Sequence, residues 1–166
     1  FFPKSVVYIC EHEKNGAMGM IVNKKLDTPG LNKIINKLIK VEKYFNTFKS
    51  NTFFGGPVLL EKGIILHHSD YSSSKSISIS KSISITSDQG ALGDLKKKEG
   101  VPFKIILGHA GWSAGQLERE IENGDWLIQN TTSDFIFNLP PNQMWEHAAR
   151  SIGLDTNSNL GTPGQA

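Results

Sequence analysis

The apolar positions near the N-terminus form two short β-rich runs with a polar stretch between them. The runs span Val6 to His12 and Ala17 to Asn23. Asn15 and Gly16 lie in the polar stretch, and this pair is typical of a two-residue hairpin turn because both residue types tolerate positive φ. The pattern therefore predicts a β-hairpin, in which Asn23 ends the second strand and can point a polar group into a cleft.

A helical period follows the sequence Thr-Pro-Gly at positions 28–30. Apolar residues recur at positions 31, 34, 35, 38, 41 and 45. This spacing predicts one apolar face of a long helix. Another face carries Lys33, Lys37, Lys40 and Lys43. Such a stripe could follow phosphates, but it is more often only the solvated face of an amphipathic helix.

The next apolar runs are separated by glycine. Two phenylalanines lead into Gly55, Gly56 and Pro57. Adjacent glycines before a proline indicate either a plain turn or a backbone that another group approaches closely. Strands are expected at Val58 to Leu60 and at Ile64 to Leu66.

Isoleucine and serine alternate between Ser72 and Ser87. Because side chains alternate between the two faces of a strand, this stretch is expected to be one long strand or a hairpin that turns near Ser80. A short helix through Leu92 and Leu95 is expected to follow.

The clearest pattern is a strand that leads into a glycine-rich turn and then a helix. An apolar run that ends at Leu107 predicts the strand, and the sequence GHAGWSAG follows it. Ser113 and Gln116 have the spacing of a capping box, so the helix is expected to begin near Ala114. Gly124 is expected to end it.

Three further elements are expected beyond this helix. The apolar runs at Trp126 to Ile128 and Asp134 to Leu139 are interpreted as strands. Helical spacing from Trp145 to Ile152 predicts a helix, with Asn142 as its cap and Gly153 at its end.

Length and composition favour a single folded domain. The chain has 166 residues, and the 38% that are hydrophobic are concentrated in periodic blocks. We expect one domain over residues 1–154 and a fraying tail over residues 155–166.

No run approaches the ~18 apolar residues of a membrane span. The net charge of +2 is small for a dedicated nucleic-acid-binding protein, and the single cysteine, Cys10, favours a reducing, cytoplasmic location.

One short motif suggests catalysis. Residues 111–115 match G-x-S-x-G between a strand and a helix, which is the context of a nucleophile elbow. Asp125 or Asp134, followed by His147, would complete the order Ser113, Asp, His of a serine hydrolase. Against this hypothesis, the chain is short for an α/β-hydrolase, no oxyanion-loop motif precedes the serine, and capping already explains Ser113.

The histidines do not follow a metal-binding spacing. His67 and His68 are consecutive, so on a strand they point to opposite faces, and no clustered Cys/His motif occurs. Walker and G-x-G-x-x-G motifs are also missing from the sequence. We therefore expect neither a metal nor a cofactor. Trp112, in the predicted turn, is the tryptophan expected to form a pocket wall.

Several motifs occur in an order that is typical of one protein family. They are SVVYICEH from Ser5, GMIVNK from Gly19, GGPV from Gly55, LH from Leu66, GHAGWSAGQLEREI from Gly108 and W-x-x-A from Trp145. In these motifs the chain resembles the AlgH/YqgE-like bacterial proteins. The match covers nearly the whole chain, and the GWxxGQLE block is specific.

The resemblance implies a single mixed α+β domain with a bifurcated or barrel-like sheet surrounded by helices. It implies no established reaction, although a transcription-regulator label is attached to some members. The motif positions that the resemblance carries over to this chain are Asn23, Gly55, Gly56, Pro57, His67, Trp112, Gly115, Gln116, Glu118 and Asn123.

These observations lead to one main hypothesis and two alternatives. The main hypothesis is a non-catalytic binding or regulatory protein for an unknown ligand or protein partner. Its cleft would be formed at element ends, where clefts commonly lie, by Asn23, Gly55, Gly56, Pro57, His67, Trp112, Gln116 and Glu118. The alternatives are the Ser113 hydrolase and a regulator that binds DNA directly, with an affinity that falls steeply as salt is added. A homo-oligomer is also compatible with the sequence.

Overall fold

The computed structural model describes residues 3–26 and 51–153. The strands are β1 (Val7–Glu13), β2 (Gly16–Ile21), β3 (Thr52–Phe54), β4 (Val58–His68), β5 (Ile77–Ser78), β6 (Ile83–Thr86) and β7 (Phe103–Ser113). The helices are α3 (Gly90–Lys97), α4 (Gln116–Glu122), α5 (Ser133–Asn138) and α6 (Pro141–Ser151). The predicted helix over positions 31–45, its lysine stripe and the predicted tail lie outside the described residues.

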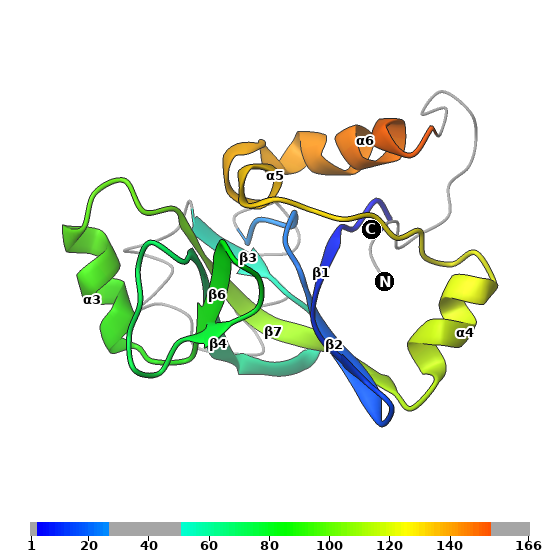
Figure 1. Ribbon diagram of the computed structural model, residues 1–166, viewed down its shortest axis with the longest axis horizontal. Coiled ribbons are helices and arrows are strands. Elements are labelled where there is room, and N and C mark those ends of the chain that lie inside the picture. The colour runs from blue at the N-terminus through cyan, green and yellow to red at the C-terminus, as the bar shows by residue number, and fades with distance from the viewer. Residues whose placement is uncertain (1–2, 27–50, 154–166) are drawn as a thin grey trace.

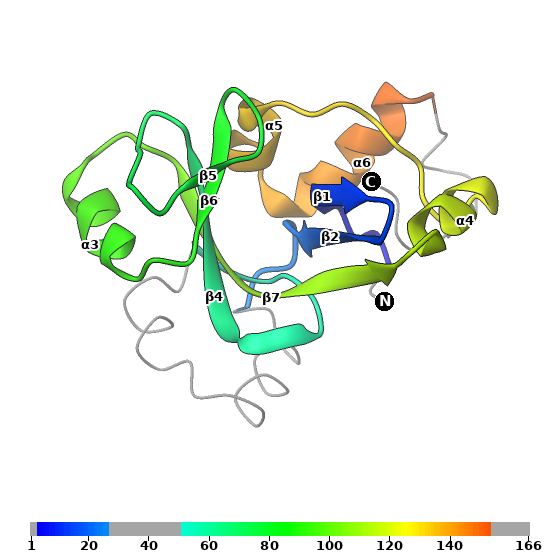
Figure 2. The same ribbon diagram turned by 60° about the horizontal axis from the view of Figure 1, so that its bottom comes forward.

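The long strand β7 belongs to both halves of a curled sheet. Its C-terminal half pairs antiparallel with β2, with Ala110 opposite Gly19. Its N-terminal half pairs antiparallel with β4 and parallel with β3. Within the described residues the strand order is β1-β2-β7-β4-β6-β5, with β3 beside β7 (Figures 1 and 2). The expected mixed α+β domain with a bifurcated or barrel-like sheet is thus confirmed, and the sheet is a curled half-barrel.

Glycines allow two backbones to meet where the halves of the sheet join. The amide of Gly55 donates to the carbonyl of Leu107 at 2.8 Å, and its carbonyl accepts from the amide of Ile21 at 2.9 Å. A Cβ on Gly55 or Gly56 would overlap the backbone of Gly108 or His109. The close approach, and not a plain turn, therefore explains the two glycines.

The core lies on both faces of the sheet. Successive side chains of β7 point to opposite faces of the sheet. Ile105 and Leu107 therefore join a cluster with residues of α3 and α4, whereas Ile106 joins a cluster with residues of α5 and α6. Figure 1 shows α5 and α6 above the sheet, with α3 and α4 at its two sides. Within residues 3–26 and 51–153, no helix is both long enough and apolar enough to cross a membrane.

Several predicted elements are confirmed with small shifts. β1 and β2 form the expected hairpin, but Glu13 pairs with Gly16, so the loop is Lys14 and Asn15. The Ser/Ile repeat forms the β5–β6 hairpin. The short helix is α3, and the C-terminal helix is α6, which begins at Pro141 without the expected Asn142 cap and is followed by Gly153 at φ +81°.

Two predicted boundaries were wrong. The two strands expected between positions 58 and 66 are the single strand β4, which contains a register shift and has Leu59 at φ +50°. The glycine-rich stretch through Ser113 is not a turn, because it pairs with β2 as part of β7.

The runs at positions 126–128 and 134–139 are not strands. The first has no regular structure, and the second is mostly helix α5. The side chain of Thr132 caps α5 by accepting a hydrogen bond from the amide of Phe135, a local signal that outweighs the strand-like apolar run.

Candidate functional site

A pocket of about 340 Å³ lies between β1, α4 and the segment that joins α4 to α5. We call this segment, residues 126–131, the connector. Figure 1 shows it passing from α4 across β1 to α5. The pocket is lined by Val6, Val7, Tyr8, Ile9, His12, Trp112, Leu117, Ile121, Trp126, Leu127, Ile128, Gln129, Asn130, Thr131, Phe135 and Ile136. Most of these side chains are apolar or aromatic, with a small group of polar side chains among them.

Glu120 holds two walls of the pocket together. One oxygen of its carboxylate, Oε1, accepts from the indole Nε1 of Trp112 at 3.1 Å and of Trp126 at 2.8 Å. The other oxygen, Oε2, accepts from Gln116 Nε2 at 2.9 Å. The two indole rings meet edge to face, with centroids 5.9 Å apart. Glu120 thus ties the start of the connector to β7 through α4.

These contacts also set the charge of Glu120. Burial raises the pKa of its carboxyl group, but the hydrogen bonds from Trp126, Gln116 and Trp112 together outweigh burial and leave the pKa below its ordinary value. The carboxylate is therefore ionised at neutral pH, and its charge strengthens each of the three hydrogen bonds.

A second polar pair links β1 to α4 beside the pocket. His12 Nε2 contacts Glu118 Oε1, and each side chain is about half exposed. His12 lines the pocket itself. This pair therefore gives the mainly apolar pocket a polar group at the hairpin end of β1.

Ser113 has a structural role in the turn between β7 and α4. Its amide and its hydroxyl both donate to Gln116 Oε1, at 2.9 and 3.2 Å. The predicted reach of Gln116 back to Ser113 is confirmed. The predicted cap is wrong, because the helix begins at Gln116 after Gly115 at φ +76° and the serine hydroxyl bonds to a side chain instead of an amide.

The structure does not join the side chains of the hydrolase hypothesis. Asp134 accepts from Asn138 Nδ2 at 2.6 Å, and the ring of His147 lies 5.6 Å from that of Phe135. In the part of the chain that the structure describes, no hydrogen bond connects Ser113, Asp134 and His147. Asp125 makes a backbone bond to Glu120 and has no side-chain bond to either Ser113 or His147 in that part.

Asn23 connects the end of β2 to the start of β1. Its Oδ1 accepts from the amide of Val6 at 2.9 Å, and its Nδ2 donates to the carbonyl of Lys4 at 2.8 Å. Both bonds are buried or partly buried. They position β1 beneath the pocket, although Asn23 does not line it.

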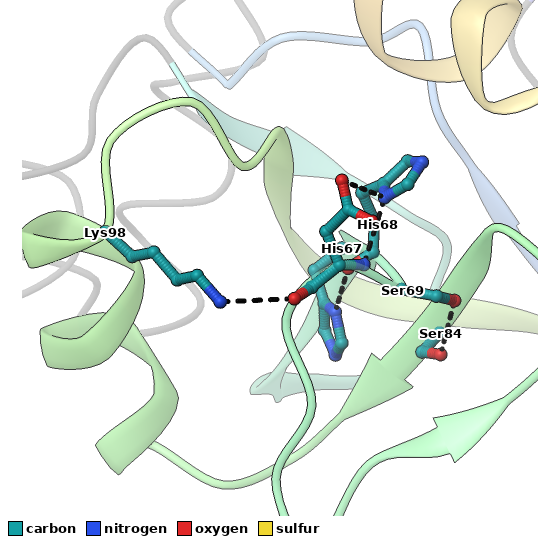
Figure 3. A network of polar contacts seen from close by, with 6 residues as sticks. His67, His68, Ser69, Ser84 and Lys98 are labelled. Atoms are coloured by element: carbon teal, nitrogen blue, oxygen red, sulfur yellow. Dashed lines mark hydrogen bonds and ion pairs between the residues drawn. The ribbon is translucent and has the colours of Figure 1, made fainter.

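His67 is buried at the far end of the sheet. Its Nδ1 lies 2.9 Å from the carbonyl of His68, and its Nε2 lies 3.1 Å from Ser76 Oγ. Burial lowers its pKa, so the ring is neutral, Nδ1 donates to the carbonyl and Nε2 accepts from the hydroxyl. Figure 3 shows the surrounding network, in which Ser69 contacts Ser84 and Lys98 donates to a backbone carbonyl.

The predicted site residues therefore lie in four places. Trp112 lines the pocket, and Gln116 and Glu118 border it from α4. Gly55, Gly56 and Pro57 lie at or next to the junction between β3 and β7, and His67 and Asn23 lie in the two networks just described. Within residues 3–26 and 51–153, no three His, Cys, Asp or Glu side chains are placed to hold a metal ion.

Sequence reasoning missed Glu120, Trp126 and His12 as site residues. Glu120 was given no role, and Trp126 was assigned to a strand. A usable signal did exist. Gln116 and Glu120 have i, i+4 spacing on a helix flanked by two tryptophans, and indole N–H groups need an acceptor when they are buried.

Known proteins resemble this chain over nearly its whole length. A family model described as AlgH-like matches residues 1–157. UPF0301 protein Tgr7_2910 of Thioalkalivibrio sulfidiphilus is 36% identical over 166 residues, which cover 99% of this chain and 88% of that protein. A UPF0301 protein of Buchnera aphidicola is 38% identical over 157 residues, covering 92% and 82%.

Two solved structures share the fold. The solution structure of the AlgH protein from Pseudomonas aeruginosa has a TM-score of 0.69 and 28% identity, and the match covers 98% of this chain and 86% of that one. The crystal structure of protein DIP2367 from Corynebacterium diphtheriae has a TM-score of 0.62 at 20% identity, covering 95% and 81%. The chain belongs to the AlgH-like family of uncharacterised proteins.

Proposed function

We propose that the protein is a non-catalytic binding module and that its ligand occupies the pocket between β1, α4 and the connector. The observation that carries this proposal is the composition of the pocket. Trp112 and Trp126 form adjoining aromatic walls, and Glu120 fixes both of them. Small-molecule sites typically measure ~300–1,000 Å³ and combine apolar walls with a few polar groups, so a volume of about 340 Å³ suits a modest ligand.

The lining determines the kind of ligand. Apolar contacts come from both sides, because Leu117 and Ile121 of α4 face Phe135 and Ile136 of α5 across the edge of β1. Polar contacts come from His12 at the hairpin end and from residues 129–131 of the connector. A molecule with an apolar body and polar groups at its ends therefore fits best.

Two residues of the hydrolase alternative make other side-chain hydrogen bonds, which favours binding over catalysis. Ser113 donates to Gln116, and Asp134 accepts from Asn138. In this proposal the predicted cleft residues have two different roles. Trp112, Gln116 and Glu118 form or support the pocket, whereas Asn23, His67 and the glycines near position 55 hold the sheet in shape. The single cysteine favours a cytoplasmic location.

The proposal is tested by titration with 8-anilinonaphthalene-1-sulfonate, a fluorescent probe that has an apolar body and one charged group. With about 21 non-hydrogen atoms at ~0.3 kcal/mol each, a Kd of tens of micromolar is expected. Ile128→Asp places a charge in the lining, and we expect it to weaken binding at least ~10-fold.

Ile77→Asp is the matched control. Both isoleucines are exposed, Ile128 by 66% and Ile77 by 61%, but Ile77 lies in β5, away from the pocket. We expect the control to bind the probe like the unmodified protein. Equal affinities for the two variants, or no binding by the unmodified protein up to 1 mM, would overturn the proposal.

A further inference from the structure

The floor of the pocket is one edge of the sheet. Within the described residues β1 is the terminal strand, and it pairs with β2 on one side only. Val6 and the first three residues of β1, positions 7 to 9, line the pocket in succession. Successive side chains of a strand point to opposite faces, so a pocket on one face would be lined by alternate residues. Consecutive residues line it because the pocket runs along the strand edge itself.

The register shows which backbone groups face this edge. The amide of Val22 donates to the carbonyl of Val6 at 3.0 Å, so position 6 is hydrogen-bonded toward β2. In an antiparallel pair such positions alternate. The N–H and C=O groups of Val7 and Ile9 therefore point away from β2, consistent with the amide of Ile21, opposite Val7, donating instead to Gly55.

These outward groups have no protein partner among residues 3–26 and 51–153. Val7 is buried, with an exposed fraction of 7%, and Ile9 is half-buried. Buried backbone donors and acceptors are almost always paired with protein or with water, so these groups are free to bond to a molecule in the pocket. A row of alternating donors and acceptors is matched by another extended backbone.

We propose that the pocket takes an extended peptide segment of a partner protein, which adds to β1 as a further strand. This inference rests on the proposed binding function and names its ligand class. A strand added here would direct alternate side chains toward the two apolar walls, one from α4 and the other from α5. Main-chain bonds to Val7 and Ile9 would provide affinity, and the walls would select apolar side chains.

Charge gives the peptide a further feature. Glu11 and Glu13 are exposed at the hairpin end of β1, and Glu118 is about half exposed beside His12. Lys14 in the hairpin loop is also exposed, so these three carboxylates outnumber the basic side chain beside them. The peptide that fits best is four apolar residues long with a lysine or arginine at the end that lies beside Glu118.

The test uses a pool of acetylated hexapeptides with lysine at both ends and valine, isoleucine, leucine or phenylalanine at the four central positions. Binding to the whole protein is followed by ¹⁵N–¹H NMR and amide hydrogen exchange. We expect the best member to bind below 1 mM and to slow exchange of the Val7 and Ile9 amides at least ~10-fold. Two N-methylated versions of that peptide are then made. One carries N-methyl groups on the odd-numbered residues, and the other carries them on the even-numbered residues.

N-methylation keeps the side chains but removes donors from one edge of the peptide. We expect one methylated peptide to lose at least ~10-fold in affinity and the other to change less than ~3-fold. Equal behaviour of the two peptides would overturn the proposal, as would no binding at 1 mM. Slow exchange of Val7 and Ile9 without peptide would overturn it too, because the connector or a second copy would then already cover the edge.

A substitution that removes one charge tests the orientation of the bound peptide. Glu118→Gln should weaken the lysine peptide about threefold, whereas Glu99→Gln, an exposed control after α3, should leave its affinity unchanged. The anilinonaphthalene titration distinguishes failure of the peptide proposal from failure of the pocket proposal. If the probe binds in the pocket but no peptide does, the peptide proposal alone fails, and if neither binds, the pocket proposal fails with it.

Discussion

Replacing Glu120 with alanine should loosen the walls of the pocket and destabilise the whole domain. The substitution removes the acceptor of three hydrogen bonds, at 3.1 and 2.8 Å from the indoles of Trp112 and Trp126 and at 2.9 Å from Gln116. A hydrogen bond to a charged group contributes ~1.5–3 kcal/mol. Because Glu120 is partly exposed and water can replace some of these bonds, we expect a total loss of about 2–4 kcal/mol in the free energy of unfolding.

Urea unfolding followed by tryptophan fluorescence measures this loss. Glu122→Ala is the matched control, because Glu122 is exposed on the same helix and the same charge is removed. We expect the control to change the free energy of unfolding by less than ~0.5 kcal/mol. Similar losses in the two variants would refute the role assigned to the Glu120 contacts.

The effect should also depend on pH. The pKa of Glu120 lies below its ordinary value of 4.5 in the folded state, so the unfolded chain takes up a proton first as the pH falls. The stabilisation is therefore present above pH 4.5 and is lost as the pH falls through the folded pKa. The difference in the free energy of unfolding between the unmodified protein and Glu120→Ala should accordingly shrink in acid. A difference that stays constant would contradict the role of the ionised carboxylate.

Three further outcomes follow from buried groups and close contacts. Burial, with a smaller contribution from Lys25, lowers the pKa of Lys104 to about 8 from 10.5, so the unfolded chain binds more protons between these values and stability should rise with pH there. Across this pH range the free energy of unfolding, measured with urea, should rise by ~3 kcal/mol more in the unmodified protein than in Lys104→Met. The same pH dependence in the two proteins would contradict this prediction. Burial raises the pKa of Cys10 to about 12, so its thiol should react with a disulfide reagent at pH 8 at least ~100-fold more slowly in the folded than in the urea-unfolded protein. Gly56→Ala should lower stability by more than ~3 kcal/mol in thermal unfolding, because the residue has φ +151° and the added Cβ overlaps His109, whereas Gly111→Ala, with nothing within 4 Å, should cost less than ~1 kcal/mol.

Local signals predicted the elements that are fixed locally. Asn15 and Gly16 indicated the β1–β2 hairpin, and Gly153 marked the end of the C-terminal helix. The resemblance carried by the motifs implied the bifurcated or barrel-like sheet, which no single period in the sequence indicates. Periodicity failed at the run around Phe135 because a short apolar stretch fits either a strand or a buried helix, and the Thr132 cap decided between them.

The site was less predictable because tertiary contacts create it. Trp112 was expected to form a pocket wall, and it does line the pocket. Its partner Trp126 comes from a segment without regular structure, and their common acceptor, Glu120, reads in the sequence as one more charge on an exposed helix face. The free edge of β1 also depends on strand order, which a sequence pattern does not give.

If a ligand binds in the pocket lined by Trp112 and Trp126, the indole N–H signals of the three tryptophans report it most directly. Two of these indoles line the pocket, whereas Trp145 lies in α6 outside it. In ¹⁵N–¹H NMR with added anilinonaphthalene sulfonate, we predict that the Trp112 and Trp126 signals shift in a saturable way and that the Trp145 signal stays in place. Binding that shifts only Trp145, or that leaves both pocket indoles unmoved, would contradict the account.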